Sequence, residues 1–421
     1  MDEYQPIYQV YHLVSGELVK DFESKSKDQA MNKLHELQSM GMKQAHIQYA
    51  FNRGGIARKF DNGGSIPAIV EKVPTDPELL GMKGQLQLFA DVEMKFALTK
   101  ENVAEQLISD REAEKDPQLT MLSFGGGQDS WAILYSLIHD PEFRRTYAPK
   151  DLVVVMSDTG NEHPYTYKGI EEARILCEKH DIPFHFITND QGFHTPGWMT
   201  LKDNLIRNSV ILSATMSSKP CTASLKINPL DKYLHHFMCQ KYGFPELANK
   251  ESWKFYFNKF QTKVRVLIGF AKDEERRVIN SMKILHTLPK WKQKYVQYVF
   301  PLIEKGWNRN SAQEIIREYH PYLIPPSNCM ICFYQSDMEL IWLNRFYPAE
   351  FEQWESMERA KLNKFAHIPK NYGVYGTMTL AEKLKVANSK TDENGKAFGD
   401  YTDAELWEYK MSHGHNVKSS F

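Results

Sequence analysis

Cysteine is scarce in this chain of 421 residues, which has five: Cys177, Cys221, Cys239, Cys329 and Cys332. An odd, sparse set argues against a disulfide framework and is typical of thiols in a reducing compartment. No window reaches the roughly 20 consecutive apolar residues that a membrane helix needs. The opening residues, MDEYQPIYQV, lack the basic and apolar regions of a secretory signal. We therefore expect a cytoplasmic protein without membrane contact.

A dominant charge is also lacking. The formal net charge is -1, so no general basic field attracts nucleic acid, and only local basic patches could do so. Hydrophobic residues make up 42% and charged residues 25% of the chain, as in ordinary globular proteins. Because a single core rarely extends over 421 residues, we expect two or three domains.

The first part of the chain predicts a small α+β domain over residues 1–75. Two strands, at 7–13 and 18–22, flank the turn VSGE, a helix follows over 27–41, and QAHIQYAF forms a further strand. The glycine-rich stretch NRGGIARKFDNGGSIP reads as a loop or linker. Residues 76–116 carry a polar helical pattern and are interpreted as a helical connector.

From residue 117 the pattern alternates between strands and helices. Apolar strands are predicted at 118–124, 151–158, 182–188 and 263–270, with helices at 129–140 and 164–181. Continuous apolar strands with helical crossovers indicate an α/β fold with a doubly wound parallel sheet, which we place over 117–345. Residues 346–421 are expected to be helical, with helices from TLAEKLKVANSK and TDAELWEYKMSHGHN. The aromatic residues Trp342, Phe346, Phe351 and Trp354 recur at helical spacing and predict core packing.

Three successive glycines lie between the first strand and the first helix of this sheet, in LSFGGGQDSW at 122–131. Free backbone N–H groups and a positive helix dipole favour an anion there, and glycine lets the backbone approach phosphate oxygens. Neither the Walker motif nor the dinucleotide fingerprint is present. On this stretch alone, a phosphate loop and a plain glycine-rich turn are equally good readings.

Five segments, in order, resemble the PP-loop ATP pyrophosphatases and, within them, the branch of phosphoadenosine phosphosulfate (PAPS) reductases. They are GGGQDS, SDTGNEHPYTYKGIEE, KPCTASLKINPLDKYL, IGFAKDEERR, and PLIEKGWNRNSAQEIIREY with NCMICFYQSDMELIWL. The last is similar to a variant often encoded in phage or mobile DNA. The resemblance implies an adenine nucleotide alpha hydrolase-like fold. It also implies cleavage of ATP to AMP and pyrophosphate, with adenylylation of an acceptor for sulfur or nitrogen transfer.

The resemblance further implies a site for ATP and magnesium (Mg²⁺). Its nucleotide-binding residues would be Ser123, Gly125, Gly126, Gly127, Gln128, Asp129, Ser130, Asp158, Lys226, Arg276 and Arg277. Asp129, Lys226 and Arg276 would serve catalysis, Asp129 by holding Mg²⁺ or ordering the loop and the cations by binding phosphate. Asp158 would meet ribose or metal. The ordinary alternatives are a helix-capping Asp129, a turn Asp158 and solvated cations.

Several positions depart from the family pattern. Gly125 stands where Ser is usual and Gln128 where Lys is common, so two phosphate partners are missing. Thr222 replaces the second residue of a cysteine pair, and the tail MSHGHNVKSSF lacks the terminal thiol of PAPS reductases. The alternatives to an ATP pyrophosphatase are therefore a catalytically altered nucleotide-binding module of a defence or modification complex, or a PAPS reductase-like oxidoreductase.

The cysteines of the C-x-x-C pair, Cys329 and Cys332, make three thiols with Cys221. Such a set resembles the three-cysteine [4Fe-4S] sites of some sulfur-inserting tRNA enzymes. Zinc, with His320 or His235 as fourth ligand, and unmetallated thiols are the alternatives. Cys177 and Cys239 are expected in the core. The implied partners are an adenine nucleotide, an acceptor that is nucleic acid or a nucleotide-like small molecule, and a sulfur donor protein.

Overall fold

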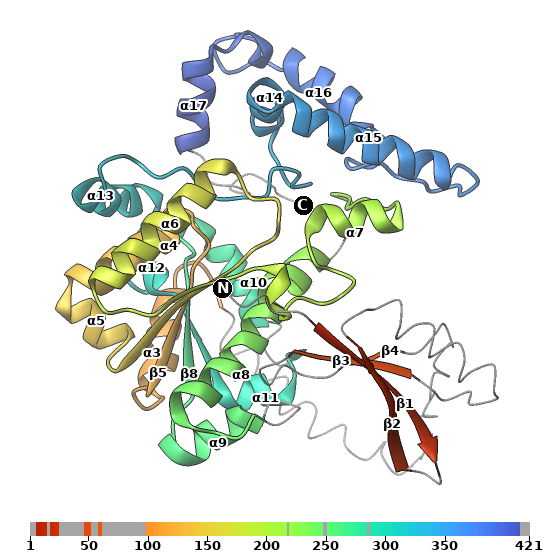
Figure 1. Cartoon of the computed structure of the whole chain (residues 1–421). Helices are drawn as coiled ribbons and strands as arrows, with labels where there is room; N and C mark the ends of the chain where they lie inside the picture. Colours follow the sequence, from red (N-terminus) through yellow and green to blue (C-terminus); the bar gives the residue numbers. More distant parts are fainter. Residues whose placement is uncertain are drawn as a thin grey trace, which may run out of the picture. The chain divides into compact units, whose positions relative to one another are not determined.

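The computed structural model describes four strands near the N-terminus and most of the chain from residue 98 onward (Figure 1). The described ranges are 6–14, 17–24, 46–51, 58–60, 98–216, 219–246, 251–283 and 287–412. The chain forms two compact units, Met1–Ala97 with Glu246–Asn249, and Leu98–Pro245 with Lys250–Phe421. The domain boundaries expected at 75, 116 and 345 stay predictions.

The first unit contains an antiparallel sheet in the order β2-β1-β3-β4. Its strands are β1 (Pro6–Val14), β2 (Glu17–Ser24), β3 (His46–Phe51) and β4 (Arg58–Phe60). β1 to β3 fall on segments expected to be extended. β4 falls in the glycine-rich stretch expected to be a loop, because Arg58–Phe60 pairs with β3. The helix expected at 27–41 lies outside the described residues, so the α+β character of this unit stays a prediction.

The second unit is an α/β structure built on a parallel five-stranded sheet in the order β7-β6-β5-β8-β9. Its strands are β5 (Leu119–Ser123), β6 (Asp151–Ser157), β7 (Phe184–Ile187), β8 (Val264–Ile268) and β9 (Val296–Val299). The four predicted strands of this sheet are confirmed. The edge strand β9 was not predicted, because Gln297 and Tyr298 are only half-buried and interrupt the apolar run typical of inner parallel strands.

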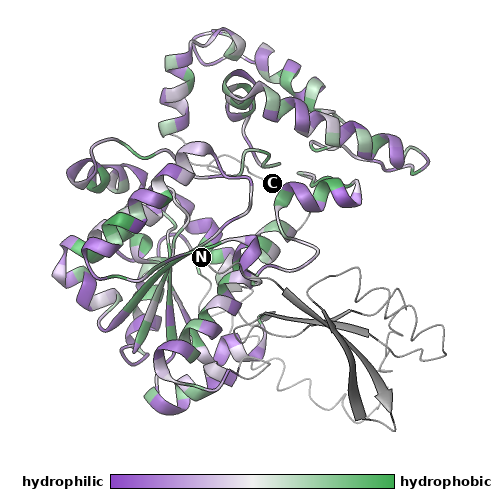
Figure 2. Cartoon of the chain, viewed as in Figure 1, coloured by the Kyte–Doolittle hydropathy of each residue, from purple (hydrophilic) through white to green (hydrophobic). Residues whose placement is uncertain are grey.

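Helices pack against both faces of this sheet, because side chains alternate along each strand. Leu122 and Val154 enter one core with α4 (Gln128–His139), α5 (Pro141–Tyr147), α6 (Pro164–Lys179) and α13 (Arg309–Tyr319). Met121 and Val153 enter the other core with α8 (Asn228–Tyr242) and α9 (Glu251–Phe260). Figure 2 shows the strands as hydrophobic and the surrounding helices as carrying both kinds of residue.

The helices after residue 336 form a third core. They are α14 (Asp337–Phe346), α15 (Pro348–Lys364), α16 (Leu380–Ser389) and α17 (Asp403–Ser412). Trp342, Phe351 and Trp354 are buried in this core and Phe346 packs against it, which confirms the prediction from their spacing. The remaining helices are α3 (Val103–Glu112), α7 (Leu201–Asn208), α10 (Glu275–Lys283), α11 (Lys290–Tyr295) and α12 (Pro301–Glu304). Across the described ranges, no helix is long and apolar enough to span a membrane.

Candidate nucleotide site

The strand order creates a switch point beside β5. The chain leaves β5 for β6 and β7 on one side and later returns to β8 on the other side. Loops that follow the two central strands diverge there, and ligands of open parallel sheets bind in such a crevice. A cavity of about 350 Å³ lies at this edge, lined by residues that follow β5, β6 and β8 and by the segments 219–226 and 326–334.

The glycine loop forms one wall of the cavity. Gly126 has a φ of +71°, a left-handed conformation that favours glycine. A Cβ atom on Gly127 would lie 2.6 Å from Ser327 Oγ and 2.9 Å from its backbone nitrogen, so no side chain fits there. The Gly125 N–H donates to Ser130 Oγ at 3.2 Å, and Ser130 donates to the Gly127 carbonyl at 2.9 Å. The loop therefore holds a defined turn at the N-terminus of α4, where an anion is favoured.

Asp129, in the first turn of α4, faces the same cavity. Burial raises the pKa of this carboxyl to about 6, and the charge of Glu274 adds to the shift, while Arg309 opposes it. Arg309 Nη2 lies 3.9 Å from Asp129 Oδ2. Asp129 Oδ1 is buried and accepts no hydrogen bond within the described ranges. Two neighbouring carboxylates with an unused oxygen have the donor chemistry that Mg²⁺ prefers.

The side chain of Gln128 is engaged in hydrogen bonds with three other parts of the chain. Its Nε2 donates to the carbonyls of Ile324 at 2.8 Å and Met411 at 3.2 Å, and its Oε1 accepts from Gln313 Nε2 at 3.4 Å. The side chain therefore ties α4 to α13 and to the end of α17. The side chain is therefore not free for the nucleotide contact that the resemblance implies for Gln128.

The C-x-x-C loop is docked on the segment that follows β6. Residues 162 and 329 form an antiparallel bridge, and Met330 N–H donates to the Asn161 carbonyl at 2.9 Å. The Glu162 carboxylate is fully buried behind this bridge and lies 3.3 Å from Lys226 Nζ. Its charge raises the pKa of Lys226 despite the opposing effect of burial.

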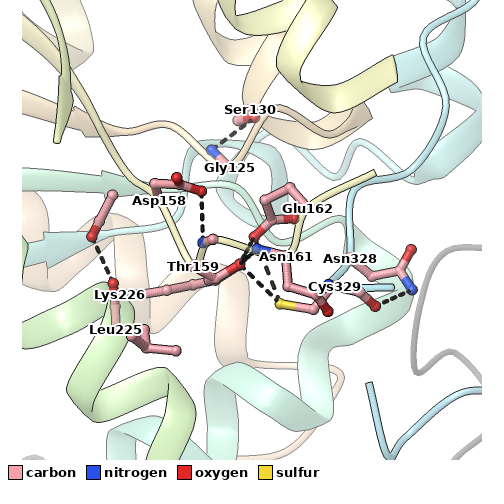
Figure 3. Close-up of polar contacts among 12 residues, drawn as sticks. Gly125, Ser130, Asp158, Thr159, Asn161, Glu162, Leu225, Lys226, Asn328 and Cys329 are labelled. Carbon is pink, nitrogen blue, oxygen red and sulfur yellow. Dashed lines mark hydrogen bonds and ion pairs between the residues drawn. The ribbon is translucent and has the colours of Figure 1, made fainter. Parts of the chain in front are cut away.

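Thr159 and Cys329 complete this cluster (Figure 3). Thr159 Oγ1 donates to Glu162 Oε1 at 3.0 Å, and Cys329 Sγ lies 3.3 Å from Thr159 Oγ1 and 3.7 Å from Glu162 Oε1. Lys226 itself lies in a π-helical turn, Thr222–Ile227, that leads into α8. The cluster thus fixes a cation and a thiol side by side at the wall of the cavity.

All three predicted metal-binding cysteines, Cys221, Cys329 and Cys332, line the cavity. Burial raises the pKa of Cys221 and of Cys329, with smaller contributions from charges that include that of Cys332. Thiolates are the donor set of iron–sulfur clusters and of zinc sites. However, no group of three or more His, Cys, Asp or Glu side chains in the described part of the chain is arranged to hold a metal ion.

The other candidate metal ligands lie elsewhere. His320 Nδ1 is 2.6 Å from Tyr135 Oη, and His235 Nδ1 bonds with Ser252 Oγ. Neither histidine lines the cavity, so the structure does not place either one as a fourth zinc ligand. Cys177, in α6, and Cys239, in α8, are both buried, as predicted.

The structure distinguishes the two predicted arginines. Arg277 lines the cavity, forms an ion pair with Glu274, and its guanidinium lies 4.1 Å from the Phe270 ring centroid. Arg276 is exposed and does not line the cavity. Asp158 does not line it either, because its Oδ1 accepts hydrogen bonds from Gly160 N–H at 2.8 Å and Tyr167 Oη at 2.9 Å.

Sequence reasoning missed several residues of the site. Lys219, Arg309, Glu274 and Ser327 line the cavity, and Glu162 lies behind it. Glu274 had a signal, since it stands beside the arginines of IGFAKDEERR. Arg309 lies in the segment PLIEKGWNRNSAQEIIREY and Ser327 directly precedes NCMICFYQSDMELIWL, but neither residue was singled out. The start of α13 and the loop before the C-x-x-C pair reach the cavity only through tertiary packing. Burial, followed by the charge of Arg277, lowers the pKa of Lys219.

Comparisons with known proteins add little to this geometry. No protein-family model matches the chain. No curated protein matches it either. Among solved structures, the chain is similar to the U34-tRNA thiolase NcsA from Methanococcus maripaludis with its [4Fe-4S] cluster, at 14% identity and a TM-score of 0.31, over 74% of this chain and 88% of that chain. A similarity at that level assigns neither a family nor an activity to the chain.

Proposed function

We propose that the chain is a PP-loop ATP pyrophosphatase of the PAPS reductase-like branch, with the doubly wound adenine nucleotide alpha hydrolase-like fold. It binds ATP, splits it to AMP and pyrophosphate, and adenylylates an acceptor for sulfur or nitrogen transfer. One observation carries the proposal: a glycine loop at a helix N-terminus, four cations and two carboxylates line a single cavity at the switch point. The cations are Lys219, Lys226, Arg277 and Arg309.

The residues have distinct roles in this reaction. The backbone N–H groups of the glycine loop and the hydroxyl of Ser130 hold phosphate oxygens, and Asp129 with Glu274 holds Mg²⁺. An acceptor oxygen bonds to the α-phosphorus, and the bond from that phosphorus to the α,β-bridging oxygen breaks, so pyrophosphate leaves. Lys226 and Arg277 stabilise the negative charge that grows on the leaving group. Positioning and charge stabilisation supply most of the rate in phosphoryl and nucleotidyl transfer.

The three thiols are proposed as ligands of a [4Fe-4S] cluster or of zinc, with Cys221, Cys329 and Cys332 on the walls of the nucleotide cavity. Bound there, either group would supply sulfur-transfer chemistry next to the nucleotide, with the sulfur coming from a donor protein. This chain's own contribution is to hold the thiols beside Lys226 and Thr159 and to keep the Cys329 loop docked on residues 161–162.

Products of ATP turnover test the activity. With the acceptor present, AMP and pyrophosphate should appear, and the Lys226→Met variant should lose most of the rate. ADP and orthophosphate would exclude the mechanism. Absorption and metal analysis of anaerobically purified protein test the thiols: a cluster absorbs near ~400 nm, whereas zinc is colourless. Cys332→Ser should lose the metal and Cys239→Ser, in the core, should keep it.

A second candidate function is a nucleotide-binding module without turnover, within a defence or modification complex. Two observations favour it over an active ATP pyrophosphatase: Gly125 lacks a hydroxyl, and the side chain of Gln128 is committed to Ile324 and Met411. An oxidoreductase is disfavoured because the tail lacks the terminal thiol of PAPS reductases. Such a module would bind ATP but would release no pyrophosphate with any acceptor. Binding and turnover measured on one preparation therefore separate the two functions.

A further inference from the structure

Two stretches of the second unit contain no acidic residue. Neither residues 204–230 nor residues 359–381 include an Asp or a Glu, although the chain has 53 acidic residues in 421. At that frequency, stretches of this combined length would carry about six carboxylates. They carry basic residues instead: Arg207, Lys219, Lys226, Arg359, Lys361, Lys364 and Lys370. The basic charge is local, because the whole chain has a formal net charge of -1.

Residues 204–230 and residues 359–381 pack against each other and form one continuous surface. α7 lies beside α15 in Figure 1, and Lys364 Nζ, at the end of α15, donates to the Asn208 carbonyl at 3.0 Å. Farther along, the Ala214 N–H donates to the Val374 carbonyl at 2.7 Å. We call the surface formed by residues 204–216, 219–230 and 359–381 the basic track.

Carboxylates outside the two stretches pair with three of the seven cations of the basic track: Arg207 with Asp203, Lys226 with Glu162 and Arg359 with Glu355. In the described residues, Lys219, Lys361, Lys364 and Lys370 form no ion pair with a carboxylate. Glu358 is fully buried, and its oxygens accept backbone N–H groups of Val374 at 2.8 Å and Leu380 at 2.7 Å. At the edges, Arg359 pairs with Glu355 at 2.8 Å, with more than half of the arginine side chain exposed. Exposed pairs of this kind contribute little free energy and can be exchanged for contacts with phosphate.

Apolar side chains are also exposed along the basic track. Eleven large apolar side chains are exposed in the described residues, and six of them belong to the track: Ile206, Met216, Ile227, Ile368, Tyr372 and Met378. Cations beside exposed apolar groups, of which Tyr372 is aromatic, are typical of surfaces that bind single-stranded nucleic acid, where phosphates meet the cations and bases stack on aromatic rings.

The basic track ends inside the candidate site. Lys219 and Lys226 belong to the track and line the cavity, as does Cys221. Lys219 Nζ lies 4.0 Å from the ring centroid of Tyr334, and Tyr334 Oη donates to the Met216 carbonyl at 3.5 Å. A polyanion bound along the track would therefore enter the cavity beside the three thiols.

We propose that the basic track binds a single strand of nucleic acid and leads one of its nucleotides into the cavity as the acceptor. The binding surface stands on the charges and contacts above, whereas the acceptor role rests on the proposed function. Sequence-independent phosphate contacts dominate such binding, so salt should weaken it strongly.

Fluorescence anisotropy with labelled single-stranded RNA and DNA oligonucleotides, over a series of salt concentrations, tests the proposal on the full chain. The test variant is Arg359→Gln/Lys364→Gln/Lys370→Gln. The control variant, Lys150→Gln/Lys179→Gln/Lys254→Gln, removes the same charge at exposed positions that each lie within three residues of a carboxylate. Circular dichroism establishes that both variants fold.

The test variant should bind at least 10-fold more weakly near 0.1 M salt. Its plot of log affinity against log salt should be shallower by about 2, since each lost single-strand phosphate contact removes about 0.7. The control should match the wild type. The proposal is overturned if wild type binds no oligonucleotide, if both variants weaken equally, or if anionic lipid vesicles bind the track while oligonucleotides do not. ATP titration on the same samples isolates the nucleotide site: intact oligonucleotide binding without ATP binding would contradict the proposed function and leave the track standing.

Discussion

Replacing Asp129 with Asn should stabilise the free protein at neutral pH. The carboxylate is buried beside Glu274, with Arg309 at 3.9 Å as its cationic neighbour, and one of its oxygens accepts no hydrogen bond in the described structure. A charge in that position is costly without a bound cation. The amide of Asn has nearly the same shape and carries no charge, so it removes the cost while keeping the packing.

The size of the effect follows from the pKa. Burial raises the pKa of Asp129 from its ordinary 3.8 to about 6. At 1.36 kcal/mol for each pKa unit, the ionised form costs up to about 3 kcal/mol. The pKa of about 6 already includes the attraction to Arg309, so the loss of the attraction to the N-terminus of α4 is the remaining offset, of about 1 kcal/mol. We expect Asp129→Asn to raise the free energy of unfolding by about 1–2 kcal/mol at pH 7.5.

The sign of the pH dependence is fixed by the same shift. A folded pKa above the unfolded value means that the folded state holds the proton more tightly. The wild type therefore has the full benefit of the protonated Asp129 below about pH 4 and loses it as pH rises through about 6. The Asn variant has no such proton, so the difference between the two should vanish toward pH 4 and level off above pH 7.

Urea unfolding at a series of pH values, without nucleotide or metal, measures this difference. Asp116→Asn, at an exposed position, controls for the loss of one negative charge. The reasoning is refuted if Asp129→Asn is less stable than the wild type at pH 7.5, or if the difference between them does not change with pH.

Two further predictions come from paired substitutions. Gly127→Ala should lower the free energy of unfolding by about 1–3 kcal/mol and weaken ATP binding, because its Cβ would lie 2.6 Å from Ser327 Oγ. In Gly125→Ala the Cβ would lie 3.8 Å from that oxygen, so this variant should match the wild type. Urea unfolding and ATP titration measure the two effects. In titration calorimetry, Arg277→Ala should bind ATP at least 10-fold more weakly than the wild type, because Arg277 lines the cavity. Arg276 is exposed and lies outside the cavity, so Arg276→Ala should bind ATP within 2-fold of the wild type. Equal losses in the two variants would contradict the placement of Arg277.

The strand–loop–helix around the glycine loop could be predicted because its signals are local. Apolar runs mark β5 and β6, and the glycines at 125–127 interrupt the pattern between β5 and α4. The edge strand β9 was not predicted, because two of its four residues are only half-buried and polar residues are tolerated there. β4 was not predicted either, because its extended conformation depends on pairing with β3 and not on its own composition.

The candidate site could be predicted only in part, for a similar reason. Cys221 and Cys329 stand far apart in the sequence, and the resemblance alone indicated that they meet the same cavity. Whether Arg276 or Arg277 faces inward depends on the rotation of α10, which neighbouring exposed positions do not reveal. Arg309 comes from α13, whose apolar face is buried against α4, so its role follows from packing and has no motif.

Titration calorimetry of ATP with Mg²⁺ into the wild type and Asp129→Ala tests the central claim most directly, with circular dichroism to establish that the variant folds. The cavity at the end of β5 should bind Mg²⁺–ATP in the wild type, and loss of the Asp129 carboxylate should weaken that binding at least 10-fold, because it removes one of the two carboxylates that line the cavity and would hold Mg²⁺. Unchanged affinity in the variant, or no binding to the wild type, would contradict the assignment of this cavity as a nucleotide site.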